Sequence, residues 1–293
     1  MISNEKEYYF IDTHAHLGML KDKTPEKAVR DAEKEGVRYI INVGTGLEDS
    51  RKSLEFSRSF DNVFATIGIH PHYTKGFGRS EEQNLELLIS GHKKHSKKGE
   101  SNADENAKSS KVYKNGKIVA VGEIGFDFYR NLSPKKDQER AFITQVELAV
   151  KYNLPVIIHD RDAHQDTLRI VRKYAGSKNF RAVMHCFSGD SNFAEECLKL
   201  GLFISFTGIL TFPNAKKTVD AARIIPINRI FIETDSPFLA PQAKRGKENY
   251  PGYVKYVAEK IAEIKDLDLT EVAAVTSKDA EEFFSLNKYI SSR

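Results

Sequence analysis

Cysteine is scarce in this chain, and long apolar runs are absent from it. Cys186 and Cys197 are the only cysteines among 293 residues, and neither belongs to a Cys-x-x-Cys pair. This spacing argues against a disulfide framework and against a cysteine zinc site. No stretch approaches the ~20 apolar residues that a membrane span needs, and no apolar segment follows a basic flank at the N-terminus. We therefore expect a cytoplasmic protein that does not associate with membranes.

Positive charge is concentrated in one segment. The net charge is +4, and the stretch from His92 to Lys117 contains eight lysines and three acidic residues, so the rest of the chain is close to neutral. Global charge therefore gives no argument for nucleic-acid binding. We expect a mobile basic insertion at residues 91–117, because its composition cannot bury enough surface to offset the entropy of ordering. It is either an arm that touches phosphates or a solvated loop, and we favour the loop.

Short apolar runs alternate with amphipathic segments along the chain. Most of these runs are continuously apolar, which is typical of strands covered on both faces. We predict eight strands: Tyr8–Thr13, Tyr39–Val43, Phe64–Ile69, Ile118–Gly122, Pro155–Ile158, Ala182–Met184, Phe203–Phe206 and Ile230–Ile232. Helix signals lie between them; Thr24-Pro25-Glu26 begins one helix and Gly36 ends it. Eight strand–helix units in a single domain, residues 1–293, predict an α/β fold of the (β/α)8 TIM-like barrel type, although the pattern also allows an open doubly wound sheet.

Histidine and acidic side chains follow the predicted strands where each strand ends. They follow five different strands: His14 and His16, Glu123, His159, His185, and Asp235. In a parallel barrel the carboxyl ends of all strands meet on one face, where active sites lie. A single histidine at a strand end is ordinarily structural, but this many polar groups would repel or pair poorly without a counter-charge. A divalent cation removes both costs, so we predict a metal centre.

The number of ligands predicts two ions. Six ligands exceed what one tetrahedral zinc site with an open position can use. We assign one ion to His14, His16, Glu123 and Asp235, and a second ion to Glu123, His159 and His185. Two divalent ions ~4 Å apart can activate a water and stabilise both oxygens of an in-line displacement, which suits phosphate esters. Mixed histidine and carboxylate ligands accept Mg, Mn or Zn, so the metal identity stays open.

Six ordered motifs together resemble the TatD family of metal-dependent deoxyribonucleases. They are FIDTHAHL, GIHPH, VGEIGFDFY, PVIIHDR, HCFSG and ETDSPFLAP, and they extend from Phe10 to Pro241. The resemblance implies a barrel of the metallo-dependent hydrolase type with a binuclear site, whose ligands carry over onto the six residues assigned above. It also implies cleavage of DNA, typically from the 3′ end of single strands, with some family members acting on RNA or on D-aminoacyl-tRNA. Residues 91–117 depart from the family pattern. The resemblance therefore does not settle how substrate reaches the site or which substrate is preferred.

The resemblance and the site together predict a 3′–5′ exonuclease that acts on single-stranded DNA, with RNA as a further substrate, through a water activated by two metals. We expect a monomer. Asp235 could accept the proton of the attacking water as well as holding a metal, or it could be a ligand only. His70 could contact the scissile phosphate or protonate the leaving oxygen, or it could have only a structural role in the turn Ile69-His70-Pro71. Glu123 completes the catalytic set, and we expect His72 to be structural or peripheral.

Further residues are assigned to the surroundings of the metals. Asp12 and Glu233 would orient the metal ligands without binding a metal themselves. Glu233 could instead belong to an ordinary buried ion pair. Arg161 could bind a phosphate of the substrate, or pair with Asp160 or Asp162. Aromatic residues beside the motifs could stack bases, although such residues more often pack loops. They are Phe126, Tyr129, Phe187 and Phe238.

Two other functions remain open from the sequence. One is an amidohydrolase-like enzyme that acts on another ester or amide, including D-aminoacyl-tRNA deacylation. Many such enzymes bridge their metals with a carboxylated lysine, whereas this chain has Glu123 after strand four and no lysine before Arg130. The other is a non-catalytic module that binds metal or nucleic acid. The size of the ligand set argues against it, because a structural metal site is closed and smaller.

Overall fold

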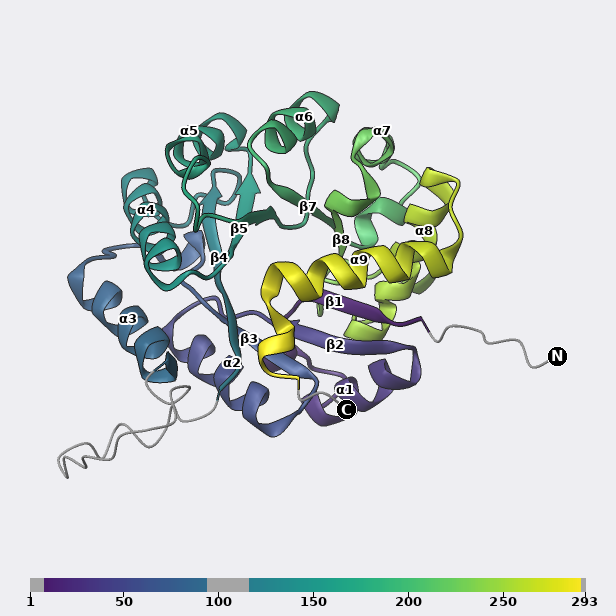
Figure 1. Cartoon of the computed structure of the whole chain (residues 1–293), viewed down its shortest axis with the longest axis horizontal. Helices are drawn as coiled ribbons and strands as arrows, with labels where there is room; N and C mark the ends of the chain where they lie inside the picture. The colour runs from purple at the N-terminus through teal and green to yellow at the C-terminus, as the bar shows by residue number, and fades with distance from the viewer. Residues whose placement is uncertain (1–7, 94–115, 291–293) are drawn as a thin grey trace. The chain divides into compact units, whose positions relative to one another are not determined.

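The structure is a computed structural model that describes residues 8–93 and 116–290 (Figure 1). It contains eight strands: β1 (Phe10–Ala15), β2 (Val37–Asn42), β3 (Val63–Ile67), β4 (Ile118–Asp127), β5 (Val156–Arg161), β6 (Ala182–Met184), β7 (Phe203–Phe206) and β8 (Ile230–Ile232). The strands form one sheet in the order of the chain, β1 to β8. The pairs β3–β4, β4–β5, β5–β6 and β7–β8 are parallel.

A helix follows each strand, and two helices follow the last one. They are α1 (Pro25–Lys34), α2 (Leu47–Ser59), α3 (Arg79–Lys93), α4 (Lys135–Tyr152), α5 (His164–Tyr174), α6 (Ser191–Lys199), α7 (Lys216–Ile224), α8 (Val254–Lys265) and α9 (Leu269–Phe284). A parallel bridge joins Ala15, at the end of β1, to Ser236, beyond β8. This pairing of first and last strands, with the sheet order, confirms the predicted (β/α)8 barrel class over the open sheet. No helix among the described residues is both long and apolar enough to cross a membrane.

All eight predicted strands are present, but several end later than predicted. β6, β7 and β8 have the predicted bounds, whereas β1 continues through His14. β4 continues through Glu123 to Asp127, and β5 continues through His159 to Arg161. The predicted ends of these three strands are therefore too early, and His14, Glu123 and His159 lie inside strands. A bulge in β4, described below, is the physical reason for the length of that strand.

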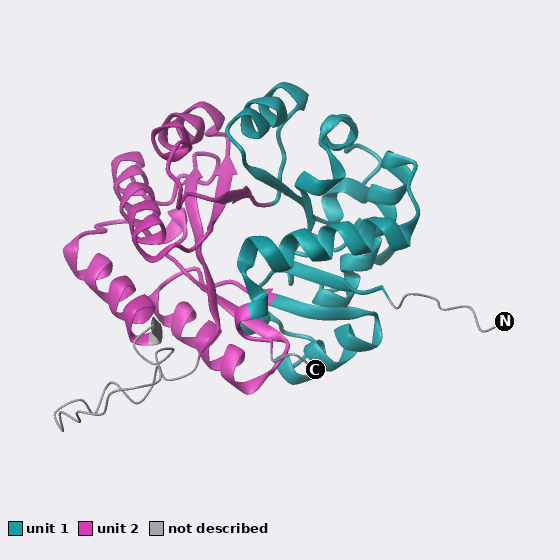
Figure 2. Ribbon diagram, viewed as in Figure 1, with its two compact units in different colours: residues 1–40, 186–287 teal, residues 41–185, 288–293 magenta. Residues whose placement is uncertain are grey.

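The chain divides into two compact units (Figure 2). Unit 1 comprises residues 1–40 and 186–287, and unit 2 comprises residues 41–185 and 288–293. The single domain of residues 1–293 stays a prediction. Residues 94–115, which are most of the predicted basic insertion, lie outside the described residues. At the edges of this insertion, Gly91 belongs to α3, and the backbone N–H of Lys117 donates to Ser57 Oγ at 3.1 Å.

Unit 1 is held by an aromatic core at β7 and β8. The ring of Phe231 in β8 stacks on the ring of Phe203 in β7, with 4.6 Å between centroids. Phe283 of α9 packs against both rings, at 5.0 and 5.2 Å. Burying each phenylalanine side chain contributes ~1.5–3 kcal/mol to stability. These contacts fix β8, which carries two candidate site residues just beyond its end, Glu233 and Asp235.

Candidate metal centre

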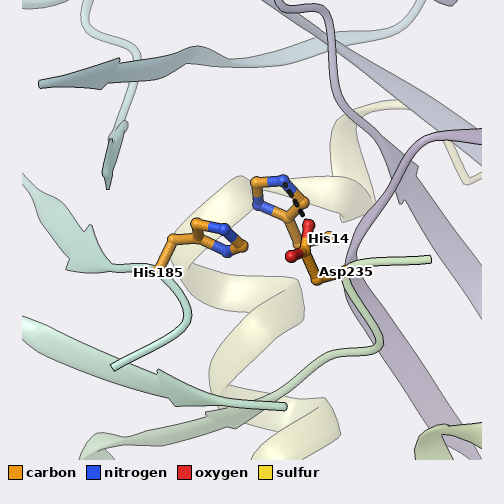
Figure 3. Close-up of side chains that lie close together, drawn as sticks. All are labelled: His14, His185 and Asp235. Atoms are coloured by element: carbon orange, nitrogen blue, oxygen red, sulfur yellow. Dashed lines mark ion pairs between the residues drawn. The ribbon is translucent and has the colours of Figure 1, made fainter. Parts of the chain in front are cut away.

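Three side chains of unit 1 that were predicted to bind metal lie together, and we call them the His14 cluster. His14 is in β1, His16 follows β1, and Asp235 lies three residues beyond β8. The Nε2 atoms of the two histidines are 3.2 Å apart. Asp235 Oδ1 lies 3.4 Å from Nε2 of His16 and 3.8 Å from Nε2 of His14, and Figure 3 draws the His14–Asp235 pair. The period of two along a strand puts both imidazoles on the same side, as predicted.

Asp12 holds the backbone around this cluster. Its buried carboxylate accepts hydrogen bonds from the N–H of Thr234 at 2.8 Å and from the N–H of His14 at 3.3 Å. The Thr234 hydroxyl donates to the other carboxylate oxygen. Burial raises the pKa of Asp12 to about 8, although these hydrogen bonds act in the opposite direction. Asp12 therefore supports His14 through its own backbone N–H and Asp235 through the preceding residue, Thr234. The contacts described for Asp12 do not include an imidazole ring.

Four side chains of unit 2 form a second group, which we call the Glu123 cluster. Glu123 Oε1 lies 2.6 Å from Nδ1 of His159. The same oxygen lies 3.4 Å from Nε2 of His70 and 3.5 Å from Nε2 of His185. His185 follows β6 directly, and His70 follows β3. Three imidazoles thus converge on one carboxylate oxygen.

A bulge in β4 places Glu123. Between Val121 and Ile124, β4 advances three residues while β5 advances two, so β4 contains one additional residue at this point. Such a bulge re-aims a side chain and allows the ladder to continue beyond it. Gly122 has φ +150°, and a Cβ there would lie 2.7 Å from Cβ of Ile157. Gly125 has φ +137°, and a Cβ there would lie 2.1 Å from the carbonyl oxygen of His159. Both glycines are required for β4 to approach β5 this closely.

Asp127 is a site residue that the sequence analysis left without a role. Its Oδ2 lies 2.7 Å from Nε2 of His72 and 3.3 Å from Nε2 of His159, and its Oδ1 accepts from the N–H of Arg130 at 2.7 Å. Burial raises the pKa of Asp127, but these three hydrogen bonds lower it by more, so this pKa lies well below its usual value. Its spacing of four from Glu123 within one strand was the signal for a shared face. His72, predicted to be structural or peripheral, is a partner of this carboxylate.

The two histidines beside Glu123 differ in charge. Burial lowers the pKa of His159, but its hydrogen bonds with Asp127 and Glu123 more than offset this, and the pKa rises to about 9. Burial lowers the pKa of His70 to about 4, against the attraction of Glu123. At neutral pH and without metal, His159 is therefore charged and His70 is neutral. The Nδ1 of His70 accepts the N–H of His72 at 3.1 Å, so the ring proton of His70 is on Nε2.

Two glutamines of α4 fix the backbone of this cluster. Gln145 accepts from the N–H of Ile69 at 2.7 Å and donates to its carbonyl at 3.1 Å. Gln138 accepts from the N–H of Asp127 at 2.9 Å and donates to its carbonyl at 3.3 Å. Both side chains are buried. A helix thus positions the residue before His70 and the carboxylate that contacts His159.

Glu233 fixes the turn after a predicted ligand. Its Oε1 accepts the N–H of Cys186 at 2.7 Å, and Cys186 directly follows His185. Cys186 has φ +46°, an unusual conformation for a residue with a side chain. The carboxylate therefore holds the backbone next to His185, which is one of the predicted metal ligands.

Only some of the residues that were predicted to contact substrate lie at the surface. Arg161 is exposed at the end of β5, and its guanidinium carbon lies 4.6 Å from the centroid of the Tyr129 ring. Asp160 instead pairs with His164 at 2.6 Å. Tyr129 and Phe238 are 62% and 51% exposed. Base stacking by the other two aromatics is wrong, because the core buries them: Phe126 and Phe187.

The donor sets fit divalent cations. Glu123 Oε1 lies within 3.5 Å of imidazole nitrogens of His159 and His185, and the His14 cluster supplies two imidazole nitrogens and a carboxylate oxygen over similar distances. Imidazole with carboxylate is the ligand mixture of zinc and manganese sites, and magnesium accepts the carboxylates. A (β/α)8 barrel with such clusters belongs to the class of metal-dependent hydrolases.

Comparison with known proteins identifies the family. Residues 11–285 match the family model of TatD related DNase, and the chain therefore belongs to the TatD family of metal-dependent hydrolases. It is 37% identical to the uncharacterized metal-dependent hydrolase YabD of Bacillus subtilis, over 94% of this chain and 99% of that protein. It is 28% identical to the 3′-5′ ssDNA/RNA exonuclease TatD of Escherichia fergusonii, over 86% of this chain and 89% of that protein. The crystal structure of the TatD homologue YJJV from Escherichia coli K12 has a TM-score of 0.80 at 26% identity and covers 94% of this chain and 98% of that chain.

Proposed function

We propose that this protein is a metal-dependent nuclease that hydrolyses phosphodiester bonds of DNA, as a 3′–5′ exonuclease on single strands. The observation that carries the proposal is the convergence of three imidazoles on Glu123 Oε1 within unit 2. Unit 1 contains a second group of potential metal ligands, the His14 cluster. Membership of the TatD family and the name of the Escherichia fergusonii relative support a nucleic-acid substrate. RNA is a second substrate to test.

The proposed metal assignment follows the sequence. One divalent cation is assigned to His14, His16, Asp235 and Glu123, and the other to Glu123, His159 and His185. When bound, two such cations lower the pKa of a water and neutralise the charge of the phosphate. Metal titration of Glu123→Ala tests the assignment, because loss of a shared ligand weakens both sites, whereas His159→Ala weakens one.

His70 fits a role as hydrogen-bond donor to the phosphate. Because its Nδ1 accepts from the N–H of His72, a metal at Nε2 would require the opposite tautomer and loss of that hydrogen bond. The N–H at Nε2 faces the Glu123 cluster, where an anionic phosphate oxygen would accept it. A neutral His70 favours this contact over protonation of the leaving oxygen. Asp235 would accept the proton of the attacking water, through the oxygen that faces His16.

The test is hydrolysis of single-stranded DNA in the presence of Mn or Mg. A 3′–5′ exonuclease converts 5′-labelled DNA into a ladder of shortening products, and releases a labelled mononucleotide from 3′-labelled DNA at the first cleavage. Glu123→Ala should abolish both products, while the control Glu139→Ala, which removes a partly exposed carboxylate of α4 that pairs with Arg169, should retain them. Elemental analysis of the purified protein identifies the metal. Absence of nucleotide release by the wild type, with turnover of a lactone, an amide or D-aminoacyl-tRNA, would favour the amidohydrolase-like alternative.

A further inference from the structure

The loop between β8 and α8 presents a cationic surface, which we call the basic loop (Lys244–Lys247). Arg245 and Lys247 are exposed, and Lys244 is partly exposed. No carboxylate among residues 8–93 and 116–290 forms an ion pair with Arg245 or Lys247. The neighbouring Glu248 uses both carboxylate oxygens to accept the N–H groups of Lys21 and Asp22, at 2.7 and 2.8 Å. The basic loop therefore keeps its charge available for an external anion.

The basic loop is fastened beside the His14 cluster. Asn249, which is buried, donates from Nδ2 to the carbonyl of Thr234 at 2.8 Å and to the carbonyl of Phe238 at 2.6 Å. Thr234 directly precedes Asp235, so both ends of the loop are held next to this predicted ligand. Arg245 is four residues from Asn249, which limits the distance between their Cα atoms to roughly 14 Å. The cations are thus kept within a short distance of Asp235.

An exposed aromatic side chain lies beside the His14 cluster. Phe238 is 51% exposed, and the centroid of its ring lies 6.2 Å from that of His16. Proteins that bind single strands combine cations that track the backbone with aromatic rings on which bases stack. Phe238 and the basic loop supply both features within unit 1.

We propose that the basic loop binds phosphates of a single-stranded nucleic acid next to the bond that is cleaved, with Phe238 stacking on a base. The inference rests on the proposed nuclease function and specifies the substrate: an oligonucleotide with several phosphates, in preference to a mononucleotide ester. Each cation that neutralises a phosphate releases counterions from the strand, so the contribution of the loop depends on salt. Lys244, whose Nζ lies 5.5 and 5.4 Å from the ring centroids of Tyr253 and Tyr256, is held more firmly than its neighbours.

The test measures equilibrium binding by fluorescence anisotropy of a labelled single-stranded oligonucleotide, with EDTA present to prevent cleavage. The double variant Arg245→Gln/Lys247→Gln should lower the slope of log affinity against log salt by about 1.4, since each contact to a single strand contributes about 0.7. This corresponds to about 25-fold weaker binding at 0.1 M salt, taking 1 M salt as the reference. Phe238→Ala should weaken binding with the slope unchanged.

The control is the double variant Lys217→Gln/Lys278→Gln, which removes two exposed lysines of unit 1 from α7 and α9. It should bind as the wild type does, and the melting temperatures of all variants should agree. Wild-type affinity and slope in the Arg245/Lys247 variant would overturn the proposal. So would an equal loss in the control, because the effect would then be one of net charge.

Hydrolysis assays separate this proposal from the proposed function. A small diester such as bis(p-nitrophenyl) phosphate needs the metal centre alone, so the Arg245/Lys247 variant should hydrolyse it at the wild-type rate while its KM for oligonucleotide rises. If the wild type cleaves the oligonucleotide and the variant has an unchanged KM, the proposed role of the basic loop is contradicted. The proposed nuclease function is then unaffected. Wild type that hydrolyses neither substrate contradicts the nuclease, and the anisotropy measurement still decides whether the loop binds nucleic acid.

Discussion

Glu123 and His159 are joined by a contact of 2.6 Å between Oε1 and Nδ1. The other imidazole nitrogen faces Asp127 at 3.3 Å, so both nitrogens of His159 lie against carboxylates. This arrangement raises the pKa of His159 to about 9 despite its burial. In the metal-free protein a proton is therefore held where the proposal places a cation.

Metal binding should release this proton. At about pH 7.5 we expect His159 to release roughly one proton when metal binds. The metal affinity should therefore rise with pH up to about 9. Calorimetric titration in buffers of different ionisation enthalpy measures the release. The raised pKa also means that this pair stabilises the metal-free fold fully below about pH 6.5, and that the stabilisation is lost as pH rises through about 9. Proton release of zero between these limits would contradict the prediction.

Asp127→Asn should weaken metal binding without unfolding the protein. The amide retains an acceptor for the N–H of Arg130 but cannot accept from both His72 and His159, so the ring of His159 loses its orientation. Loss of such an outer partner typically costs 10–100-fold in metal affinity or activity. Metal titration and hydrolysis assays measure the effect. Glu139→Gln, which neutralises a partly exposed carboxylate of α4 that pairs with Arg169, is the control and should leave both values unchanged.

Gly125→Ala should destabilise the protein and weaken metal binding together. The added Cβ would lie 2.1 Å from the carbonyl oxygen of His159 at a φ of +137°, so β5 must move. A strained backbone of this kind costs ~1–3 kcal/mol, before the clash is counted. We expect a melting temperature lower by about 3 °C or more. Gly176→Ala, where a Cβ meets nothing within 4 Å, is the matched control; equal melting curves for the two variants would refute the steric argument.

The pair of Tyr129 and Arg161 should affect substrate binding and not the chemical step. Both side chains are exposed and stacked, and a base that stacks on such a ring contributes ~1–3 kcal/mol. Tyr129→Ala should therefore raise KM for single-stranded DNA by about 5- to 150-fold at nearly constant kcat. Arg161→Gln should raise KM and reduce its dependence on salt. Leu132→Ala, at an exposed position three residues from Tyr129, controls for loss of surface apolar area, and an effect of equal size there would argue against stacking.

The fold class was predictable because its signals are local. Continuous apolar runs mark strands buried on both faces, and Thr24 caps α1 as predicted by accepting the N–H of Lys27. The ends of β4 and β5 were not predictable, because they depend on the bulge at Glu123 and on the close approach at Gly125. Those features involve residues far apart in sequence, and a glycine in a strand does not reveal which backbone approaches it.

The candidate site was predictable to the extent that each residue carries its own chemistry. Histidines and carboxylates after apolar runs are conspicuous, whereas Gln138 and Gln145 look like ordinary polar positions of an amphipathic helix. Their hydrogen bonds to Asp127 and Ile69 depend on how α4 packs. The orientation of aromatic side chains was likewise not predictable, which is why the sequence left open whether Phe126 stacks bases or packs inside the protein, where the structure buries it.

The closure of the basic loop by Asn249 has a practical consequence for protein engineering. The anchoring hydrogen bonds join Asn249 to Thr234 and Phe238, and none of them involves residues 244–247. Arg245 and Lys247 could therefore be exchanged for acidic, neutral or other basic residues without rebuilding the barrel, with Gly246 kept for its φ of +83°. Selectivity among polyanions would then become adjustable separately from turnover.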